Sequence, residues 1–405
     1  MAMWASRSRS ISHSLNSKIH FLEFFKQRQF SSPSRSSALP KTSISENCGN
    51  PLPVLEKIGA LYAVRRFEST NAAEQASEVR NKEKLFLDGR MEFTSKLKFI
   101  SEFPAEKVHC YRVLDNNGCP LTSMTIPQVA KDIAVKMYRD MVTLQLMDMV
   151  FYEAQRQGRI SFYATTTAEE AINIASAAAL TTDDVVLPQY REPGVLLSRG
   201  FTLQDFANQC FGNKADYGKG RQMPVHYGSS KYNYFTVQQQ SRDGVAVKGQ
   251  AYGIRSLKVD GNDALAVYGA VRAAREMAIS EQRPILIEAM TYRVGHHSTS
   301  DDSTKYRPVD EIEYWREVQN PLSRFRKWME RNGWWSRKDE AELQSKVKEE
   351  VFHAIQVAER TEKAPLADLF TDVYDHLPSN LREQEMLLRE TIKRHPQDYP
   401  SDVPI

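Results

Sequence analysis

The chain has 405 residues, of which 41% are apolar, so it can bury the core of one large α/β domain or of two ordinary domains. Its 54 basic and 51 acidic residues give a net charge of +3. This near balance excludes a protein that binds nucleic acid or an anionic membrane through bulk charge. No apolar run approaches the ~20 residues that cross a bilayer, so we expect a soluble protein.

The cysteines indicate neither a disulfide framework nor a zinc site. None belongs to a Cys-x-x-Cys pair, and no histidine lies at zinc-ligand spacing from them. We therefore expect free thiols in a reducing compartment. The four are Cys48, Cys110, Cys119 and Cys210.

The first 44 residues differ in composition from the rest. Arginine, serine and lysine are abundant, and Glu23 is the one acidic residue among them. Together with the Arg-Gln-Phe-Ser-Ser sequence at 28–32, this composition predicts a transit peptide over 1–44 that directs the chain to the mitochondrial matrix. An untargeted tail is the alternative. Residues 45–92 lack sustained periodicity, and we interpret them as a leader or extended arm before a folded body that starts near Phe93.

The folded body is expected to begin with a short strand and two helices. The strand covers 111–114. Apolar positions at helical spacing predict a long amphipathic helix over 127–156. A second helix is expected over 167–180, because Thr167 and Glu170 match a capping box.

A buried strand and a short helix are expected next. The apolar residues 185–187 predict a fully buried parallel strand, which delivers Tyr190 and Arg191 to its carboxyl end. Thr202 is placed to cap a helix that runs to Cys210.

A glycine-rich loop over 212–228 carries Lys219, Arg221, Gln222 and His226. Glycine lets backbone amides approach a phosphate, and the basic side chains favour an anion. A plain flexible connection explains this loop equally well.

A strand-helix-strand unit follows. Residues 256–259 and 285–290 are the strands, and 263–280, with Asp263 as its cap, is the helix. The fold class predicted is therefore α/β, a parallel sheet with flanking helices, followed by a helical C-terminal region. The C-terminal helices are expected over 310–315, 321–331 and 339–362.

Residues 292–303 concentrate polar side chains after the apolar strand 285–290. Open α/β sheets place their chemistry at this edge, because loops there are held by a rigid scaffold. One of His296 and His297 is expected to point inward, where a neutral imidazole can exchange a proton with a reacting carbonyl near pH 7. A solvated loop with an incidental histidine pair is the alternative.

Arg191 is the candidate anion ligand. A guanidinium keeps its charge when partly buried and can bind an anion bidentately. A fixed ion pair with Glu169 or Glu192 is the alternative.

Ser298 lies in an acidic setting for phosphorylation, since Asp301 and Asp302 follow it. A phosphate of about −1.5 to −2 charge there would repel a carboxylate substrate. A metal site built from His297 and Asp301 lacks a third ligand, so no metal ligands are predicted.

Four segments are specific enough to compare with a known family: residues 155–163, 189–192, 218–227 and 292–302. In these segments the chain resembles the alpha subunits of mitochondrial branched-chain 2-oxoacid (2-oxoisovalerate) dehydrogenases. The resemblance extends from about Phe93 to the C-terminus. The His-His-Ser-Thr-Ser-Asp-Asp sequence favours the branched-chain enzymes over their pyruvate-using relatives.

The resemblance implies a thiamine-diphosphate-binding fold and assigns roles to individual residues. Tyr190 and Arg191 would hold the cofactor diphosphate, and His297 would lie beside the thiazolium and the bound 2-oxoacid. Arg293 would order the loop, and Ser298 would be the regulatory phosphoserine. The reaction implied is oxidative decarboxylation of branched-chain 2-oxoacids, with transfer of the acyl group to a lipoyl group.

The resemblance also implies partners. They are a beta subunit in a heterotetramer, a lipoyl-bearing acyltransferase core, and a regulatory kinase and phosphatase. Two small departures are visible: Ala168 stands where the family usually has glycine, and Pro308 occupies the second phosphorylation site.

One departure is large. The family carries a Gly-Asp-Gly motif and a downstream asparagine that bind Mg²⁺ with the diphosphate. Here Val237 is followed by three glutamines and then by Ser241, so the metal ligands are missing, together with roughly two strand-helix units of ~30 residues each. We therefore expect an α/β domain over 93–308 with an internal deletion near 238–241, and a helical region over 309–405.

Three hypotheses follow from this departure. The first is a branched-chain dehydrogenase alpha subunit, represented here by a splice product or incomplete gene product with impaired catalysis. The second is a partner that binds the beta subunit without catalysing the reaction. The third is an unrelated metal-dependent hydrolase that uses the histidine and aspartate cluster. A sheet that loses central strands is expected to expose apolar faces and unpaired edges.

Overall fold

The computed structural model describes residues 92–100, 108–122, 126–236, 246, 249, 252–298, 301–371, 373–401 and 403–405. The predicted transit peptide, residues 1–44, lies outside the described residues, and so does the predicted arm apart from its last residue. The predicted internal deletion near 238–241 also lies outside the described residues.

A four-stranded parallel sheet organises the described part of the chain. Its strand order is β1-β2-β5-β6, so β2 pairs with β5 although the two strands are far apart in the sequence. The parallel sheet with helices around it confirms the predicted α/β class. The strands are β1 (Phe93–Thr94), β2 (Cys110–Tyr111), β5 (Arg255–Asp260) and β6 (Ile285–Met290).

The predicted strand-helix-strand unit is confirmed as β5, α8 (Ala264–Glu281) and β6. The Asp263 side chain caps α8, because its Oδ1 accepts hydrogen bonds from the Leu265 and Ala266 amides at 3.1 Å. Its Oδ2 accepts from the amides of Val113 and Leu114. The strand predicted over 111–114 is therefore too long. β2 ends at Tyr111, because the amides of Val113 and Leu114 donate to the Asp263 carboxylate and not to a neighbouring strand.

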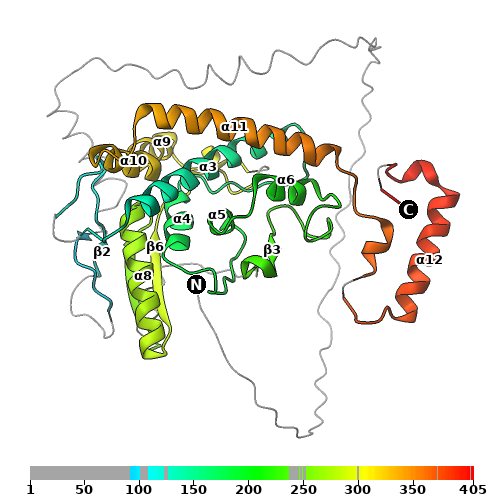
Figure 1. Ribbon diagram of the computed structural model, residues 1–405, viewed down its shortest axis with the longest axis horizontal. Coiled ribbons are helices and arrows are strands. Elements are labelled where there is room, and N and C mark those ends of the chain that lie inside the picture. The colour runs from blue at the N-terminus through cyan, green and yellow to red at the C-terminus, as the bar shows by residue number, and fades with distance from the viewer. Residues whose placement is uncertain are drawn as a thin grey trace, which may run out of the picture. The chain divides into compact units, whose positions relative to one another are not determined.

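Helix α8 packs against β5 and β6, and α11 lies along α3 and α6 (Figure 1). The predicted helices are confirmed with shifts of a few residues at their ends, and Thr202 caps α6 through a capping box with Asp205. The sequence did not predict α5 or α12. Among the described residues, none of the helices combines the length and apolarity that crossing a bilayer requires. The helices are α3 (Lys131–Arg156), α4 (Glu170–Ala178), α5 (Pro193–Ser198), α6 (Leu203–Phe211), α9 (Val309–Glu317), α10 (Pro321–Arg331), α11 (Arg337–Arg360) and α12 (Ser379–Arg394).

A buried ion cluster ties the carboxyl end of β5 to α10. Arg324 donates from Nη1 to Oδ2 of Asp260 at 2.7 Å, and Nε of Arg112 lies 3.3 Å from the same oxygen. Burial alone would raise the pKa of Asp260, but the two guanidiniums hold it below its usual range. Because all three groups are buried, removing the Asp260 carboxylate would leave two positive charges in the core without their partner.

The capping box predicted at Thr167 is wrong. Helix α4 begins at Glu170, and its N-cap, Glu169, makes no capping hydrogen bond through its side chain. The chain turns sharply just before it, where Ala168 has a φ of 75°. Glycine adopts this left-handed conformation without strain, which explains physically why glycine suits the position better than alanine.

The fully buried strand predicted over 185–187 is also wrong. Only Val186 pairs, in an isolated parallel bridge with Tyr234 of β4 (Tyr234–Phe235), a strand that forms a small antiparallel hairpin with β3 (Gly228–Ser229). Val185 and Leu187 are 47% and 46% exposed. Among the described residues, no strand of the four-stranded sheet pairs with this segment, so its apolar side chains have lost the neighbours that would bury them.

The end of α8 provides a test of backbone strain. Gln282 closes this helix with a φ of 52°, in the left-handed region. Its side chain is exposed and donates only a local hydrogen bond to the Ile279 carbonyl. We predict that Gln282→Gly stabilises the protein by about 1 kcal/mol, because glycine relieves the strain at a helix end.

The measurement is the midpoint of urea unfolding. Gln282→Ala is the matched control: it removes the same side chain but keeps a Cβ, and it should not raise the midpoint. A midpoint for Gln282→Gly at or below that of the control would contradict the assignment of strain.

Candidate functional site

Arg191 joins two loops that are far apart in the sequence. Its Nη1 donates to the Thr165 carbonyl at 2.9 Å, and its Nη2 donates to the His297 carbonyl. Burial raises the pKa values of Glu169 and Glu192, and the charge of Arg191 opposes this effect in both. The structure therefore brings Arg191 and His297 together, as predicted. The hydrogen bonds described for the guanidinium are to backbone carbonyls.

His297 follows β6 and is held by its own loop. Its amide donates to Oδ2 of Asp301 at 2.8 Å, and the same oxygen accepts from the Tyr306 hydroxyl at 2.7 Å. Arg293 lies with Nη1 3.2 Å from Nδ1 of the imidazole. Because arginine can only donate, Nδ1 is the acceptor, and a neutral ring carries its proton on Nε2.

The electrostatic surroundings keep His297 neutral. Partial desolvation, followed by the positive charges of Arg191 and Arg293, holds the pKa of its imidazole below the usual value. A neutral imidazole at pH 7 can accept a proton from a reacting group. This arrangement is chemically suited to the role expected for the loop.

His296 has other partners than His297. Its Nδ1 accepts a hydrogen bond from the amide of Ser303 at 3.0 Å and lies 2.9 Å from the Ser303 hydroxyl. Of the two histidines, His296 thus serves the fold of the loop. The loop is further held by Arg307, which donates to the carbonyls of Arg293 and Gly295 at 2.6 and 3.2 Å.

Tyr190 contacts His226, a residue that the sequence analysis assigned to the glycine-rich loop and not to this site. Its ring stacks on His226 at 5.6 Å between centroids, and the Arg191 guanidinium lies 5.2 Å from the Tyr190 centroid. The expected site therefore extends to the glycine-rich loop. The only sequence signal for this was the polar composition of that loop.

The anion-binding interpretation of the glycine-rich loop is not supported by the contacts of its cations. Lys219 forms an ion pair with Asp368 at 3.2 Å, and Arg221 donates to the Thr371 carbonyl at 2.7 Å. Both side chains thus attach the loop to the segment after α11. Ser298, the predicted phosphorylation site, lies at the turn beside His297, where its carbonyl accepts from the Asp301 amide.

Two buried carboxyl groups lie on α3 and at the start of α4, and sequence reasoning missed both. Asp148 accepts hydrogen bonds from the Tyr163 and Thr166 hydroxyls at 2.8 and 2.7 Å, and burial raises its pKa to about 6. Both carboxyl oxygens of Glu170 are buried without a hydrogen-bond partner, and burial raises its pKa to about 8. Glu170 is therefore largely protonated at neutral pH.

No group of three or more histidine, cysteine, aspartate or glutamate side chains in the described ranges is arranged to hold a metal ion. The segment in which the resemblance locates the metal ligands lies at the break after Thr236, outside those ranges.

Comparison with known proteins assigns the chain to a family. The model of the dehydrogenase E1 component family matches residues 138–242 and 235–367. The chain is 56% identical to the alpha subunit 2 of mitochondrial 2-oxoisovalerate dehydrogenase of Arabidopsis thaliana, over 79% of the chain and 83% of that protein.

The chain belongs to the 2-oxoisovalerate dehydrogenase alpha subunit family. Other relatives agree with this. The chain is 48% identical to the Arabidopsis thaliana alpha subunit 1, over 99% of both proteins, and 37% identical to the Homo sapiens mitochondrial alpha subunit, over 77% of the chain and 86% of that protein.

The match to the family model is interrupted near residues 235–242. The E1 family model matches in two pieces, and these meet and overlap at 235–242. The alignment with Arabidopsis alpha subunit 1 has 478 positions, whereas the chain has 405 residues, so at least 73 of its positions hold no residue of this chain.

Glu170 makes the stability of the fold depend on pH. An acid whose pKa is raised in the folded state binds its proton more tightly there, so its neutral form favours folding at low pH. That contribution is lost as the pH rises from the unfolded pKa near 4.5 to the folded pKa of about 8. Glu170→Gln keeps the shape and cannot ionise. We predict that it is more stable than the parent chain at pH 8.5 by at least about 1 kcal/mol.

Chemical unfolding at pH 5.5 and at pH 8.5 measures this difference. The matched control is Glu383→Gln on α12, where the glutamate is exposed and the substitution should change stability equally at both pH values. If the stability gained by Glu170→Gln is the same at both pH values, the carboxyl is not neutral in the fold.

Proposed function

We propose that this chain acts as the alpha subunit of a thiamine-diphosphate-dependent dehydrogenase. The reaction is oxidative decarboxylation of branched-chain 2-oxoacids, such as 3-methyl-2-oxobutanoate, with transfer of the acyl group to lipoyl groups in branched-chain amino acid catabolism. The observation that carries the proposal is the bond from Arg191 to the His297 carbonyl, which brings two family motifs into contact. The relatives' name, 2-oxoisovalerate dehydrogenase, supports the choice of substrate.

The organic cofactor fits the residues present. Arg191 uses two of its five N–H donors on carbonyls, so donors remain for a diphosphate, and Arg293 adds a second positive charge near His297. Tyr190 and Arg191 would hold the diphosphate, and Arg293 would keep the loop ordered through the imidazole. Thiamine diphosphate, when bound, supplies the electron sink for loss of CO₂ from a 2-oxoacid. The neutral His297 would accept or return a proton beside that substrate.

The metal does not fit the described residues. Mg²⁺ is usually bound by one or two carboxylates together with substrate phosphates, and the place where the family carries these ligands falls at residues 237–241, outside the described ranges. We therefore assign no step of the reaction to a metal in this chain.

The proposal also covers the proteins that the chain binds and the compartment in which it acts. The alpha subunit assignment implies a beta subunit, and we extend it to a lipoyl-bearing acyltransferase core and to a regulatory kinase and phosphatase that act on Ser298. A phosphate on Ser298 would add about −1.5 to −2 charge next to His297, between it and Asp301, and would repel the substrate carboxylate. The relatives are named mitochondrial, which supports a transit peptide over 1–44 and a place in the mitochondrial matrix.

A second candidate function is a catalytically impaired chain that only binds or helps assemble the beta subunit. The break in the family match at 235–242 favours it, since the metal-binding motif of the family belongs there. The exposed Val185 and Leu187 support it too, because they lack the strands that would cover them.

The two candidates predict different outcomes in reconstitution. The full chain without its transit peptide is expressed with a matching beta subunit, and decarboxylation of 3-methyl-2-oxobutanoate is followed while thiamine diphosphate and Mg²⁺ are titrated. The first candidate predicts saturable turnover in this titration. The second predicts that the complex forms but that turnover is at least about 100-fold below that of a full-length relative, because the family's metal ligands are lacking.

The control is a chain in which the segment missing between Val237 and Ser241 is restored from the Arabidopsis thaliana alpha subunit 1. It should turn over normally, and His297→Ala in that background should lower turnover by about 100-fold or more without preventing assembly. Normal turnover by the parent chain would eliminate the impaired candidate. Normal turnover by His297→Ala in the restored chain would eliminate the role given to His297.

A further inference from the structure

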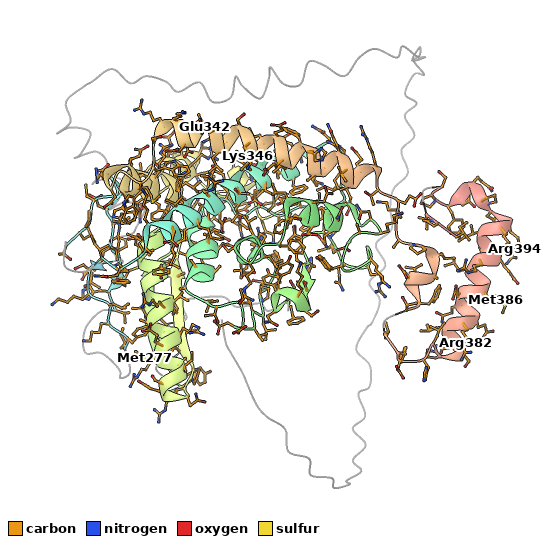
Figure 2. The ribbon with its side chains drawn as sticks, viewed as in Figure 1. Met277, Glu342, Lys346, Arg382, Met386 and Arg394 are labelled. Atoms are coloured by element: carbon orange, nitrogen blue, oxygen red, sulfur yellow. The ribbon has the colours of Figure 1, made fainter. Side chains whose placement is uncertain are left out.

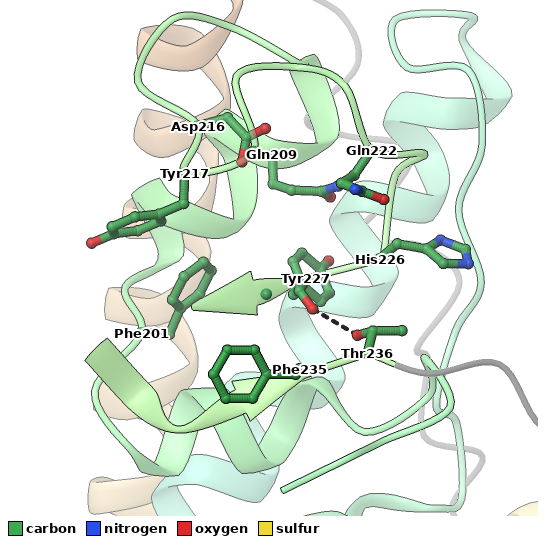
Figure 3. A pocket seen from close by; sticks show the side chains of 11 residues that line it. Phe201, Gln209, Asp216, Tyr217, Gln222, His226, Tyr227, Phe235 and Thr236 are labelled. Atoms are coloured by element: carbon green, nitrogen blue, oxygen red, sulfur yellow. Dashed lines mark hydrogen bonds between the residues drawn. The ribbon is translucent and has the colours of Figure 1, made fainter. Parts of the chain in front are cut away.

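A cavity beside the glycine-rich loop adjoins the site built around Arg191, because its wall includes His226, the residue that stacks on Tyr190. Its volume is about 510 Å³. It lies between the loop that follows α6 and the β3–β4 hairpin. Figure 3 shows Asp216 and Gln209 at one end of this cavity and the rings of Phe201, Tyr227 and Phe235 toward the other end.

The charged group in this cavity is a buried carboxylate. Asp216 is 6% exposed, and its Oδ2 accepts a hydrogen bond from the Gly220 amide at 2.9 Å. Among the described residues it belongs to no ion pair, because the nearby Lys219 and Arg221 are directed to Asp368 and to the Thr371 carbonyl. A buried carboxylate without a cation is costly, so the cavity favours a positively charged occupant.

Aromatic rings provide the rest of the wall. Phe201 and Tyr227 are buried, and their ring centroids lie 6.0 Å apart in an edge-to-face arrangement. Phe235 closes the cavity from β4 with a ring that is 41% exposed. Ring faces attract organic cations through their quadrupole, most strongly where water is excluded. Gln209 cannot compete for the ligand, since its amide is already bonded to the backbone of Met223 and Val225.

We infer that this cavity binds an organic ammonium ion, with Asp216 neutralising its charge and the rings of Phe201, Tyr227 and Phe235 covering its alkyl groups. A bare inorganic cation would leave the aromatic wall without a partner. An anion would face the carboxylate. A neutral molecule of the same shape would leave the charge of Asp216 unpaired. The cavity shares His226 with the proposed cofactor site, but it would take a ligand of the opposite charge and has no part in the proposed dehydrogenase chemistry.

The test is calorimetric titration of the full chain with choline chloride at constant ionic strength. Its neutral isostere, 3,3-dimethyl-1-butanol, is titrated in parallel, and potassium chloride is tested as a competitor. We expect saturable binding of choline, at least about tenfold weaker binding of the alcohol, and no competition by potassium.

Two variants locate the site. Asp216→Asn keeps an acceptor for the Gly220 amide and should weaken choline binding at least about tenfold. Phe235→Leu replaces a partly exposed ring and should weaken it about three- to tenfold while the fold is kept. Asp183→Asn, at an exposed aspartate, is the control with the same change in net charge and should bind choline normally.

Several outcomes would overturn the inference. They are no saturable binding of choline, equal binding of choline and its alcohol, competition by potassium at equal concentration, and unchanged binding by Phe235→Leu. None of these measurements depends on dehydrogenase activity.

Discussion

The contact between Arg191 and the backbone of the His297 loop is the interaction on which the rest of the site depends. One guanidinium donates to carbonyls of residues 165 and 297, and so fixes the end of one motif against another more than a hundred residues away. Partial desolvation, together with the charges of Arg191 and Arg293, holds the pKa of the His297 imidazole below its usual value. The loop itself is closed from the other side by Asp301. Binding of an anion and acceptance of a proton therefore become properties of one connected arrangement.

A second constraint acts on the sheet. β6 is at the edge of the four-stranded sheet in the described part of the chain, and all six of its residues are partly exposed although most are apolar. In Figure 1 it runs beside α8, the helix on which Met277 is labelled in Figure 2. A parallel strand of this composition is normally covered by neighbours on both edges. Val185 and Leu187 are also exposed and likewise lack neighbouring strands among the described residues. The proposed loss of strands near 238–241 accounts for both features, and it removes the family's metal ligands with them.

The sequence predicted well what local patterns determine. β5, α8 and β6 were found within a residue or two, because apolar runs and the Asp263 cap are short-range signals. The contact of Arg191 with His297 was implied by the family resemblance, whereas the argument from strand ends fails for Arg191, because residues 185–187 do not join the four-stranded sheet. Residues 185–187 were assigned wrongly, since burial of a strand depends on neighbours that are not local to it. The buried Glu170 and the stacking of His226 on Tyr190 were missed for the same reason: both are set by packing between distant segments.

Hydrogen exchange of the loop after β6 tests the central claim most directly. Arg191→Met keeps the length of the side chain but removes the donors that hold the His297 carbonyl. Since hydrogen bonds from charged groups contribute about 1.5 to 3 kcal/mol, amides over 293–298 should exchange at least about tenfold faster in this variant, while those of α8 keep their protection. Unchanged protection of the loop would contradict the claim that Arg191 holds it in place.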